Sequence, residues 1–298
     1  MELTRAARLR LSTAYAYADA KTRAKLVVGR LLFPRSSARW LNYVQHSDIL
    51  SSLIQCLPLT TTKIYRPYLS RQLRCADRVN VLIDHYDFLN RAGLADLTRR
   101  AAAVDVELAC LACKSGAVAR VMLSALHEGH REGELCLKLR YQGEPIFSLS
   151  CVVMMAKGEP QLMIGRLQGS AGADARDLVR DVTRDLHGAR PGRLLVALAR
   201  HVAARLGCVR VLLVSNENRI AINWWRRRHI SADYDRQWLE LGAKRCHDGN
   251  FELAPLPNAV VDIAALPSKK RAEARRKLAL MEELFVTAGA FFSRAPAA

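Results

Sequence analysis

The stretch that most constrains the fold runs from Gln161 to Trp225, where strand and helix patterns alternate. Gln161 to Gln168 has the pattern of a strand that leads into a glycine turn, and Leu194 to Leu206 has apolar residues at helical spacing. Val209 to Val214 has the length and β-branching of a buried strand. Because a helix separates the two strands, we expect them to pair in parallel within one sheet.

Upstream of this stretch, the pattern separates into a helical part and a strand-rich part. Residues 1–100 have apolar residues at three- and four-residue intervals with breaks at Pro34, Pro58 and Pro67, which predicts about five helices. From Val106 the period changes to two, which predicts an antiparallel meander of four or five strands. The expected strands are 106–113, 119–126, 133–141, 145–155 and 161–168.

Downstream, we expect helices over 174–186 and 216–225, a last strand over 250–256 and a basic helix that ends near Phe285. The predicted fold class is α+β: an N-terminal helical region, then a mixed, mainly antiparallel sheet flanked by helices. The expected division is an N-terminal helical region at 1–100, an α/β domain at 101–262 and a basic C-terminal helix and tail at 263–298.

The chain is strongly basic, with a formal net charge of +18. Lys and Arg outnumber Asp and Glu in residues 1–100 and 171–298 but balance them in residues 101–170. Such a surface attracts an anionic partner, either a phosphorylated ligand or an acidic membrane surface. A nucleic-acid partner is less favoured because no recognised nucleic-acid-binding motif is present. The alternative is a composition bias that places solvated arginines on helix faces.

The cysteines show no disulfide-framework spacing. The CxxC of Cys110 and Cys113 has neither a second pair nor zinc-spaced histidines, so we expect packing rather than a metal. No apolar run reaches the roughly 18 residues that span a bilayer, and the first residues form a poor signal peptide. We expect a cytoplasmic protein, with peripheral contact to the inner membrane as an option. The pattern does not indicate an oligomeric state.

Residues 188–193, Gly-Ala-Arg-Pro-Gly-Arg, open the helix that continues through Leu206. Pro191 suits the first turn of a helix. Arg190 and Arg193 then bring two guanidinium groups to a helix N-terminus, where free N–H groups and the helix dipole favour anions. The alternative is a helix entry with solvated arginines and no ligand.

The predicted element order resembles the fold of the GCN5-related N-acetyltransferases (GNAT). Residues 218–225, Asn-Arg-Ile-Ala-Ile-Asn-Trp-Trp, are similar to the Asn-x-x-Ala-x-x-x-Tyr helix of that superfamily, with Trp225 in place of the tyrosine that is the usual general acid. The phosphate turn also departs from the family, because a long segment separates Gly169 from Pro191. The resemblance implies acyl-CoA or another acyl or aminoacyl carrier, bound between the two parallel strands, and no metal.

A second resemblance covers nearly the whole chain and rests on short motifs in a fixed order. They are similar to motifs of the bacterial VirK/YbjX (DUF535) family. This resemblance implies links to virulence and to resistance against cationic antimicrobial peptides through the envelope, and no particular reaction. The motifs are Arg66-Pro67-Tyr68, His85-Tyr86, Ile164-Gly165-Arg166-Leu167-Gln168-Gly169, Leu186-His187-Gly188-x-Arg190-Pro191, Val214-Ser215-Asn216, Asp233-Tyr234-Asp235 with Trp238, and Ser268-Lys269-Lys270-Arg271-Ala272.

These patterns give three sets of candidate site residues. Acyl transfer needs a base for the nucleophile and an acid for the leaving thiolate. The catalytic candidates are His187, Asp233, Tyr234 and Asp235. The cofactor-binding candidates are Gly165, Gln168, Gly169, Arg190, Gly192, Arg193, Asn216 and Asn218. The substrate-binding candidates are Arg66, Tyr68, His85, Tyr86, Trp225 and Trp238.

Each set has a structural alternative. One aspartate of the Asp233-Tyr234-Asp235 motif suffices to cap the following helix, and Tyr68 is equally suited to the edge of the core. Two functional hypotheses follow. The first is a GNAT-like transferase that moves an acyl or aminoacyl group to an amine or hydroxyl. The second is a non-catalytic, envelope-associated factor that binds an anionic membrane or partner through its basic surfaces.

Overall fold

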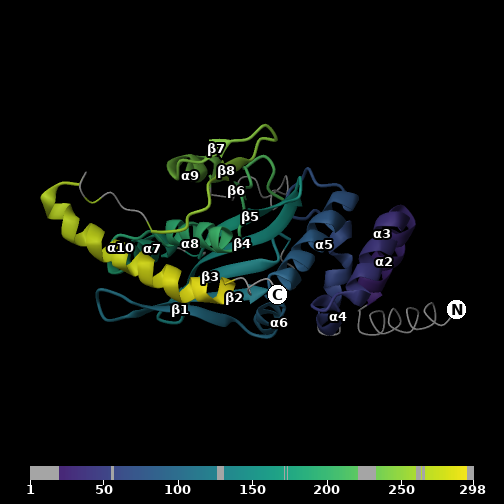
Figure 1. The fold of residues 1–298 in the computed structure, drawn as a ribbon, viewed down its shortest axis with the longest axis horizontal. Coiled ribbons are helices and arrows are strands. Elements are labelled where there is room, and N and C mark those ends of the chain that lie inside the picture. The colour runs from purple at the N-terminus through teal and green to yellow at the C-terminus, as the bar shows by residue number, and fades with distance from the viewer. Residues whose placement is uncertain are drawn as a thin grey trace.

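The computed structural model describes residues 20–54, 57–125, 131–170, 172, 174–220, 233–259, 263 and 266–293. The described chain begins with helices and continues into a sheet (Figure 1). Prolines at 34 and 58 begin α3 and η1, as expected for residues without a backbone N–H. The predicted helical content of residues 1–100 is confirmed for the described part. Its elements are α2 (Ala20–Leu32), α3 (Pro34–His46), α4 (Leu50–Leu53), the 3-10 helix η1 (Pro58–Tyr65), α5 (Cys75–Arg91) and α6 (Ala95–Ala103).

The described residues form an eight-stranded sheet in the order β1-β2-β3-β4-β5-β6-β8-β7. β5 and β6 pair in parallel from Gln161–Arg210 to Ile164–Leu213, and all other pairs are antiparallel. The predicted meander, parallel pair and mixed α+β class are therefore confirmed. The strands are β1 (Val106–Ala112), β2 (Val118–Ala125), β3 (Leu135–Tyr141), β4 (Glu144–Ala156), β5 (Glu159–Gly169), β6 (Arg210–Leu213), β7 (Lys244–Arg245) and β8 (Phe251–Leu253).

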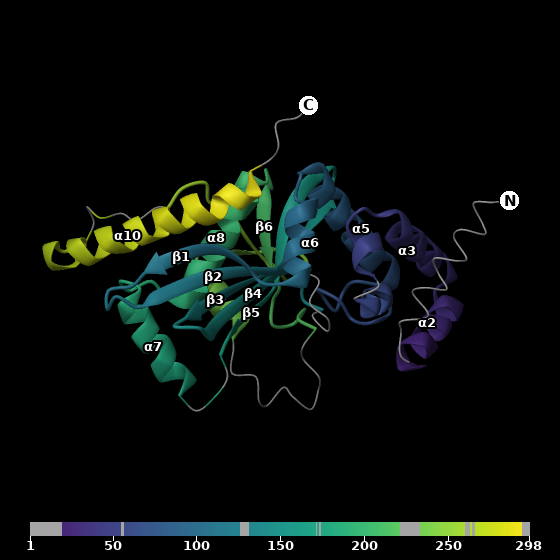
Figure 2. The same ribbon diagram turned by 90° about the horizontal axis from the view of Figure 1, so that it is seen from below.

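Two helices of the C-terminal half pack on the sheet (Figure 2). α8 packs against β3, β4 and β5, and α10 packs against β1 and α8. In the N-terminal half, α5 packs against β4 and α6 against β2. The remaining helices are α7 (Ala175–Asp185), α8 (Pro191–Arg205), α9 (Tyr234–Glu240), α10 (Ser268–Gly289) and the 3-10 helix η3 (Ala290–Phe292).

Two predictions downstream of β6 were wrong. The last strand spans only Phe251–Leu253 instead of 250–256, and Pro255, which cannot donate to a strand ladder, follows its end. Residues 216–220 form turns rather than the start of a helix, and residues 221–225 lie outside the described residues. The short strand β7, which pairs with β8, was not predicted.

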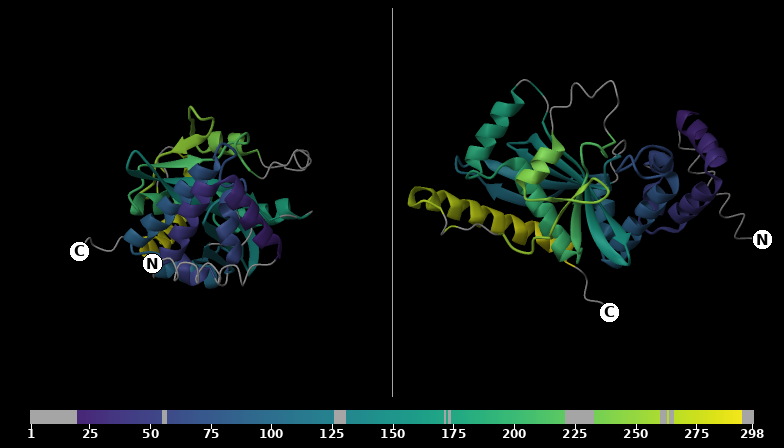
Figure 3. Two further views of the ribbon diagram at one scale, coloured as in Figure 1. Left: turned by 90° about the vertical axis from the view of Figure 1, so that its right-hand side faces the viewer. Right: turned by 90° about the horizontal axis from the view of Figure 1, so that it is seen from above.

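One hydrophobic core joins the two halves of the chain. Trp40 and Tyr86 from the helices belong to the same cluster as Val121 and Ile164 from the sheet. The boundary expected near residue 100 therefore marks a change of secondary structure within a shared core, and a division into separate domains stays a prediction. α2 and α3 lie at one end of the molecule, and α7 and the start of α10 lie at the other (Figure 3). No helix within the described ranges is long and apolar enough to cross a membrane.

Candidate functional site

A cavity of about 540 Å³ lies at the N-terminal end of α8, between α7 and α9. We call it the arginine cavity. Apolar side chains and guanidinium groups both line it, which suits a ligand with an apolar part and anionic groups. Its apolar lining includes Phe147, Leu167, Val179 and Leu241, and its arginines are Arg176, Arg180, Arg184, Arg190 and Arg193.

The first turn of α8 forms part of the wall of this cavity. Pro191 starts the helix, and no side chain caps its N-terminal end. The first N–H groups and the positive end of the helix dipole are therefore available to an anion. Gly192 allows the helix to approach β4, since a Cβ there would lie 3.0 Å from Cε1 of Phe147. The structure thus brings together Arg190, Gly192 and Arg193 of the predicted cofactor-binding set.

One carboxylate from α9 offsets part of the positive charge. Oε2 of Glu240 accepts a hydrogen bond from Nη2 of Arg193 at 2.9 Å and lies 4.0 Å from Nη1 of Arg190. The hydrogen bond from Arg193 holds the pKa of Glu240 below its usual value. All three side chains are substantially exposed, so an anionic ligand can compete for the guanidinium groups.

Lys277 of α10 adds a further cation beside this wall. Burial, followed by repulsion from Arg193 and Arg190, lowers the pKa of Lys277. On α7, Arg180 and Arg184 have ion-pair partners on their own helix, at exposed positions where such pairs contribute little. Arg190 and Arg193 therefore repel Lys277 at this wall, and a bound anion would relieve that repulsion.

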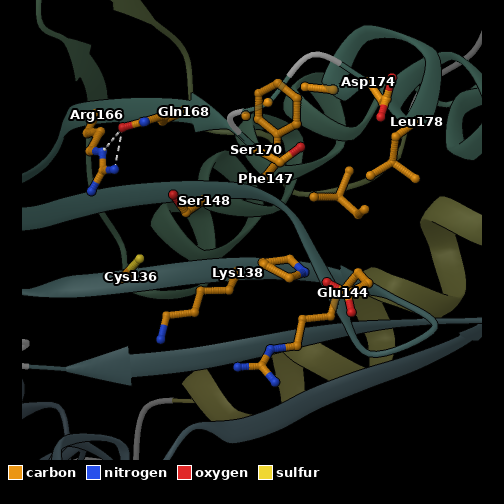
Figure 4. A pocket seen from close by; sticks show the side chains of 16 residues that line it. Cys136, Lys138, Glu144, Phe147, Ser148, Arg166, Gln168, Ser170, Asp174 and Leu178 are labelled. Atoms are coloured by element: carbon orange, nitrogen blue, oxygen red, sulfur yellow. Dashed lines mark hydrogen bonds between the residues drawn. The ribbon is translucent and has the colours of Figure 1, made fainter.

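A second cavity, of about 640 Å³, lies over β3, β4 and β5 and reaches the start of α7 (Figure 4). We call it the sheet-face cavity. Cross-strand pairing places Lys138 beside Ser148 and Ser148 beside Gln168. Nε of Arg166 donates to Oε1 of Gln168 at 2.8 Å. Phe147 borders both cavities, so they are neighbours.

Two polar atoms of the sheet-face cavity are buried without a partner. Among the described residues, neither Nε of Arg140 nor Oγ of Ser170 makes a hydrogen bond. Lys138 donates to Oδ1 of Asp105 at 2.8 Å, which neutralises this lysine. The cavity is polar and nearly balanced in charge, unlike the arginine cavity. Gln168 and Gly169 of the predicted cofactor-binding set lie here.

The gap between β5 and β6, where the sequence predicted the arm of an acyl carrier, is filled by α9. The parallel pairing ends near Ile164, and Tyr234 and Trp238 are buried beyond it. The Leu167 N–H donates to the Tyr234 hydroxyl at 2.9 Å, and Nε1 of Trp238 donates to the carbonyl of Val214 at 2.8 Å. The Trp238 indole is therefore a core side chain, and the predicted carrier-binding N–H already has a partner.

The polar residues near the start of α9 and after β6 are held by contacts with one another and with the segment before β8. Asp233 caps α9 by accepting the Arg236 N–H at 3.2 Å, which is the main cause of its lowered pKa. Asn216 donates from its side chain to Asp233 at 2.7 Å and from its backbone to Asp235 at 2.7 Å. Asn218 donates to the carbonyl of Asp248 at 3.0 Å. These contacts give each of the four side chains, Asn216, Asn218, Asp233 and Asp235, a structural role.

The structure also forms a buried charge cluster that the sequence analysis missed. Nζ of Lys63 lies 2.8 Å from both carboxylate oxygens of Glu134, which also accepts a hydrogen bond from the Tyr86 hydroxyl. Tyr68 and His85 are fully buried nearby, and Nδ1 of His85 accepts the Val153 N–H at 3.1 Å. Three predicted substrate-binding residues are therefore brought together, in the interior. Neither the segment of Lys63 nor that of Glu134 carries a local sequence signal for this cluster.

The electrostatics of this cluster favour the ion pair. Burial alone would raise the pKa of Glu134, but attraction to Lys63 and hydrogen bonds from Lys63 and Tyr86 hold it below its usual value. Glu134 is consequently an anion inside the protein at neutral pH, and Lys63 is the cation that compensates it.

The remaining predicted site residues are dispersed. His187 is half-buried in the turn after α7, with a φ of 51°, and Arg66 is half-buried at the end of η1. Gly165 faces the carbonyl of Glu132, away from both cavities. Trp225 lies outside the described residues. In the parts of the chain that the structure describes, no group of three or more His, Cys, Asp or Glu side chains is placed to hold a metal ion.

Comparison with known families places this chain among its relatives. Residues 16–288 match the family described as "Protein of unknown function (DUF535)". The chain belongs to the DUF535 family. The match covers the helical region, the sheet and nearly all of α10, so the arginine cavity and the buried charge cluster both lie within the matched residues.

Individual relatives of this DUF535 protein come from two bacteria. Uncharacterized protein YbjX of Escherichia coli (strain K12) is 28% identical over 88% of this chain and 81% of its own length. An uncharacterized protein of Haemophilus influenzae is 25% identical over 55% of each chain. Among solved structures, a mutant of a cAMP-binding acyltransferase from Mycobacterium smegmatis aligns over 70% of this chain and 65% of its own, with 13% identity and a TM-score of 0.31.

The buried histidine of this DUF535 protein makes its stability depend on pH. Burial lowers the pKa of His85 to about 4, against about 6.5 for an unfolded histidine. As the pH falls, the unfolded state therefore binds a proton at His85 before the folded state does. The contribution of His85 to the free energy of unfolding is complete above about pH 6.5 and is lost as the pH falls. When the pH is lowered from 7 to 5, protonation of His85 in the unfolded state is expected to reduce the free energy of unfolding by about 2 kcal/mol.

Urea unfolding at several pH values measures this effect. His85→Asn keeps a side-chain acceptor for the Val153 N–H and should show a flatter pH dependence in this range. His201, whose pKa burial also lowers, contributes equally to both proteins and cancels in the comparison. Equal slopes for the two proteins would contradict the assignment to His85.

Proposed function

We propose that this protein is a GNAT-like acyltransferase that holds the phosphates of an acyl-coenzyme A type carrier in the arginine cavity. The observation that carries the proposal is the convergence of Arg190, Arg193 and the uncapped N-terminus of α8 on one cavity with an apolar floor. Guanidinium groups bind phosphate in a bidentate manner, and helix N-termini favour the same anions. A carrier of this type supplies an activated acyl group as a thioester.

The size and lining of the arginine cavity fit such a ligand. A volume of about 540 Å³ lies within the range of roughly 300–1,000 Å³ found for small-molecule sites. Leu167 and Phe147 give apolar contacts for the arm and the acyl chain. The strand gap itself does not fit an arm in this structure, because Tyr234 and Trp238 fill it.

On this proposal, Leu167 connects the arginine cavity to Tyr234, the residue that takes part in the reaction. Leu167 lines the arginine cavity, and its N–H donates to the Tyr234 hydroxyl. The Tyr234 hydroxyl accepts in this hydrogen bond, so its own proton is left for the leaving thiolate, and Tyr234 is the candidate acid. The raised pKa of Tyr234, caused mainly by burial, keeps the phenol protonated at neutral pH.

The sheet-face cavity would hold the acceptor. It shares Phe147 with the arginine cavity, and its lining includes Lys138, Ser148 and Gln168, whose polar groups suit a polar amine or hydroxyl compound. An acceptor there attacks the thioester carbonyl, the carbon–sulfur bond breaks, and the acceptor's proton is lost to solvent or a base. The reaction class is acyl transfer to nitrogen or oxygen.

Thermal unfolding in the presence of coenzyme A tests the proposal. At about 100 times Kd, the ligand should add about 2.7 kcal/mol to the free energy of unfolding. Arg190→Ala removes a charged hydrogen-bond donor and should weaken binding about tenfold. Arg91→Ala, an exposed arginine on α5, is the matched control and should leave the shift unchanged. No shift with coenzyme A or acetyl-coenzyme A, or an equal shift in Arg190→Ala, would overturn the proposal.

A further inference from the structure

An apolar surface lies along α2 and its junction with α3. Leu31 and Leu32 are 78% and 67% exposed, and Val27, Val28 and Phe33 are between 42% and 54% exposed. We call these five side chains the α2 surface. They make up most of the large hydrophobic side chains that the described part of the chain exposes. Five such side chains within seven positions form a contiguous patch, and such patches usually mark interaction sites.

The opposite side of α2 is firmly packed, so the helix is not exposed through loose docking. Leu26 is 1% exposed, and a Cβ at Gly29 would lie 2.6 Å from the Tyr65 ring. The Tyr65 hydroxyl donates to Oγ of Ser37 at 2.8 Å, and Ser37 bonds the carbonyl of Gly29. The fold therefore holds the α2 surface outward in a fixed orientation.

Cations lie beside the α2 surface, and its own segment contributes no carboxylate. Residues 20–46 contain no Asp or Glu. Arg30 and Arg35 are exposed beside the leucines, and Arg30 also lines a hollow of about 410 Å³ with Val27 and Leu31. Apolar side chains ringed by cations are the composition of helices that lie in the interface of an anionic bilayer.

We propose that the α2 surface docks on an anionic lipid bilayer, with Leu31, Leu32 and Phe33 entering the headgroup boundary and Arg30 and Arg35 contacting lipid phosphates. A second copy of the chain is a poorer occupant, because a two-fold contact would place the same cations against each other. α2 lies at the end of the molecule away from α7 and the start of α10, so docking leaves the arginine cavity clear (Figure 3).

Vesicle co-sedimentation of the full chain tests this docking. The protein should pellet with phosphatidylglycerol-containing vesicles, less at high salt, and weakly with pure phosphatidylcholine vesicles. The double variant Leu31→Ser/Leu32→Ser should lose binding about tenfold or more, and Arg30→Ala/Arg35→Ala should weaken it and reduce its salt dependence. Val286→Ser, at a residue of α10 that is 74% exposed, is the matched control and should bind like the wild type.

Three results would overturn the proposal. One is no pelleting with the anionic vesicles. Another is unchanged pelleting of the Leu31→Ser/Leu32→Ser variant with a wild-type melting temperature. The third is a concentration-dependent dimer in light scattering that this variant abolishes, which would assign the α2 surface to a second copy. None of these results bears on the binding of coenzyme A in the arginine cavity.

Discussion

Replacing Lys63 by alanine is expected to lower the free energy of unfolding by about 3–5 kcal/mol, because the variant leaves the Glu134 carboxylate buried without its cation. The side chain of Glu134 is 1% exposed, and both of its oxygens lie 2.8 Å from Nζ of Lys63. The Tyr86 hydroxyl alone cannot compensate a full charge in the interior. Part of the loss should be recovered at low pH, since the pKa of Glu134 rises when Lys63 is removed.

Chemical denaturation of three variants tests this result. Lys138→Ala is the matched control, because Lys138 pairs with Asp105 at the same distance of 2.8 Å but with both side chains more exposed. Lys138→Ala should lower the free energy of unfolding by about 1 kcal/mol. The double variant Lys63→Met/Glu134→Gln removes both charges and should be more stable than Lys63→Ala. A Lys63→Ala variant no less stable than Lys138→Ala would show that Glu134 is not held as a buried anion.

Gly165→Ala is expected to destabilise the protein by about 3 kcal/mol or more, through a clash that the backbone cannot relieve. A Cβ at this position would lie 2.1 Å from the carbonyl oxygen of Glu132 and 2.9 Å from Cδ1 of Leu69. The contacted oxygen belongs to the main chain two residues before Glu134, so its displacement would also disturb the buried ion pair. Gly165 is therefore explained by packing, although the sequence suggested a role in cofactor binding.

Gly169→Ala provides the comparison on the same strand. A Cβ there would lie 3.0 Å from the Phe147 ring, which is half-buried and can shift, so the cost should be about 1 kcal/mol. Thermal or urea unfolding of both variants measures the difference. Equal stability of the two variants would contradict the close approach of β5 to the Glu132 carbonyl.

The parallel pairing of β5 and β6 was predictable because it depends on local patterns. The β-branched run at 209–214 and the apolar helix at 194–206 each identify their own element, and a helix between two strands is the usual connection of a parallel pair. The anion-suited turn at Arg190 and Arg193 was visible for the same reason, since proline and glycine mark a helix start locally.

Local patterns did not predict which side chains fill the gap between β5 and β6, or which ion pair forms in the interior. The pairing of Lys63 with Glu134 joins residues 71 positions apart, and neither segment has a local feature that selects the other. Asp233, Tyr234 and Asp235 looked catalytic because they are polar and adjacent, yet their contacts with Asn216 and Leu167 are formed only by the tertiary fold. Periodicity also identifies the apolar residues of α2 without showing which of them meet solvent.

A crystal structure of the protein with coenzyme A tests the proposed function most directly. The account predicts phosphate groups within hydrogen-bond distance of Arg190 and Arg193 and of the first N–H groups of α8, with the arm directed toward Leu167. Phosphates bound in the sheet-face cavity, or no bound ligand at a coenzyme A concentration far above that of the protein, would contradict it.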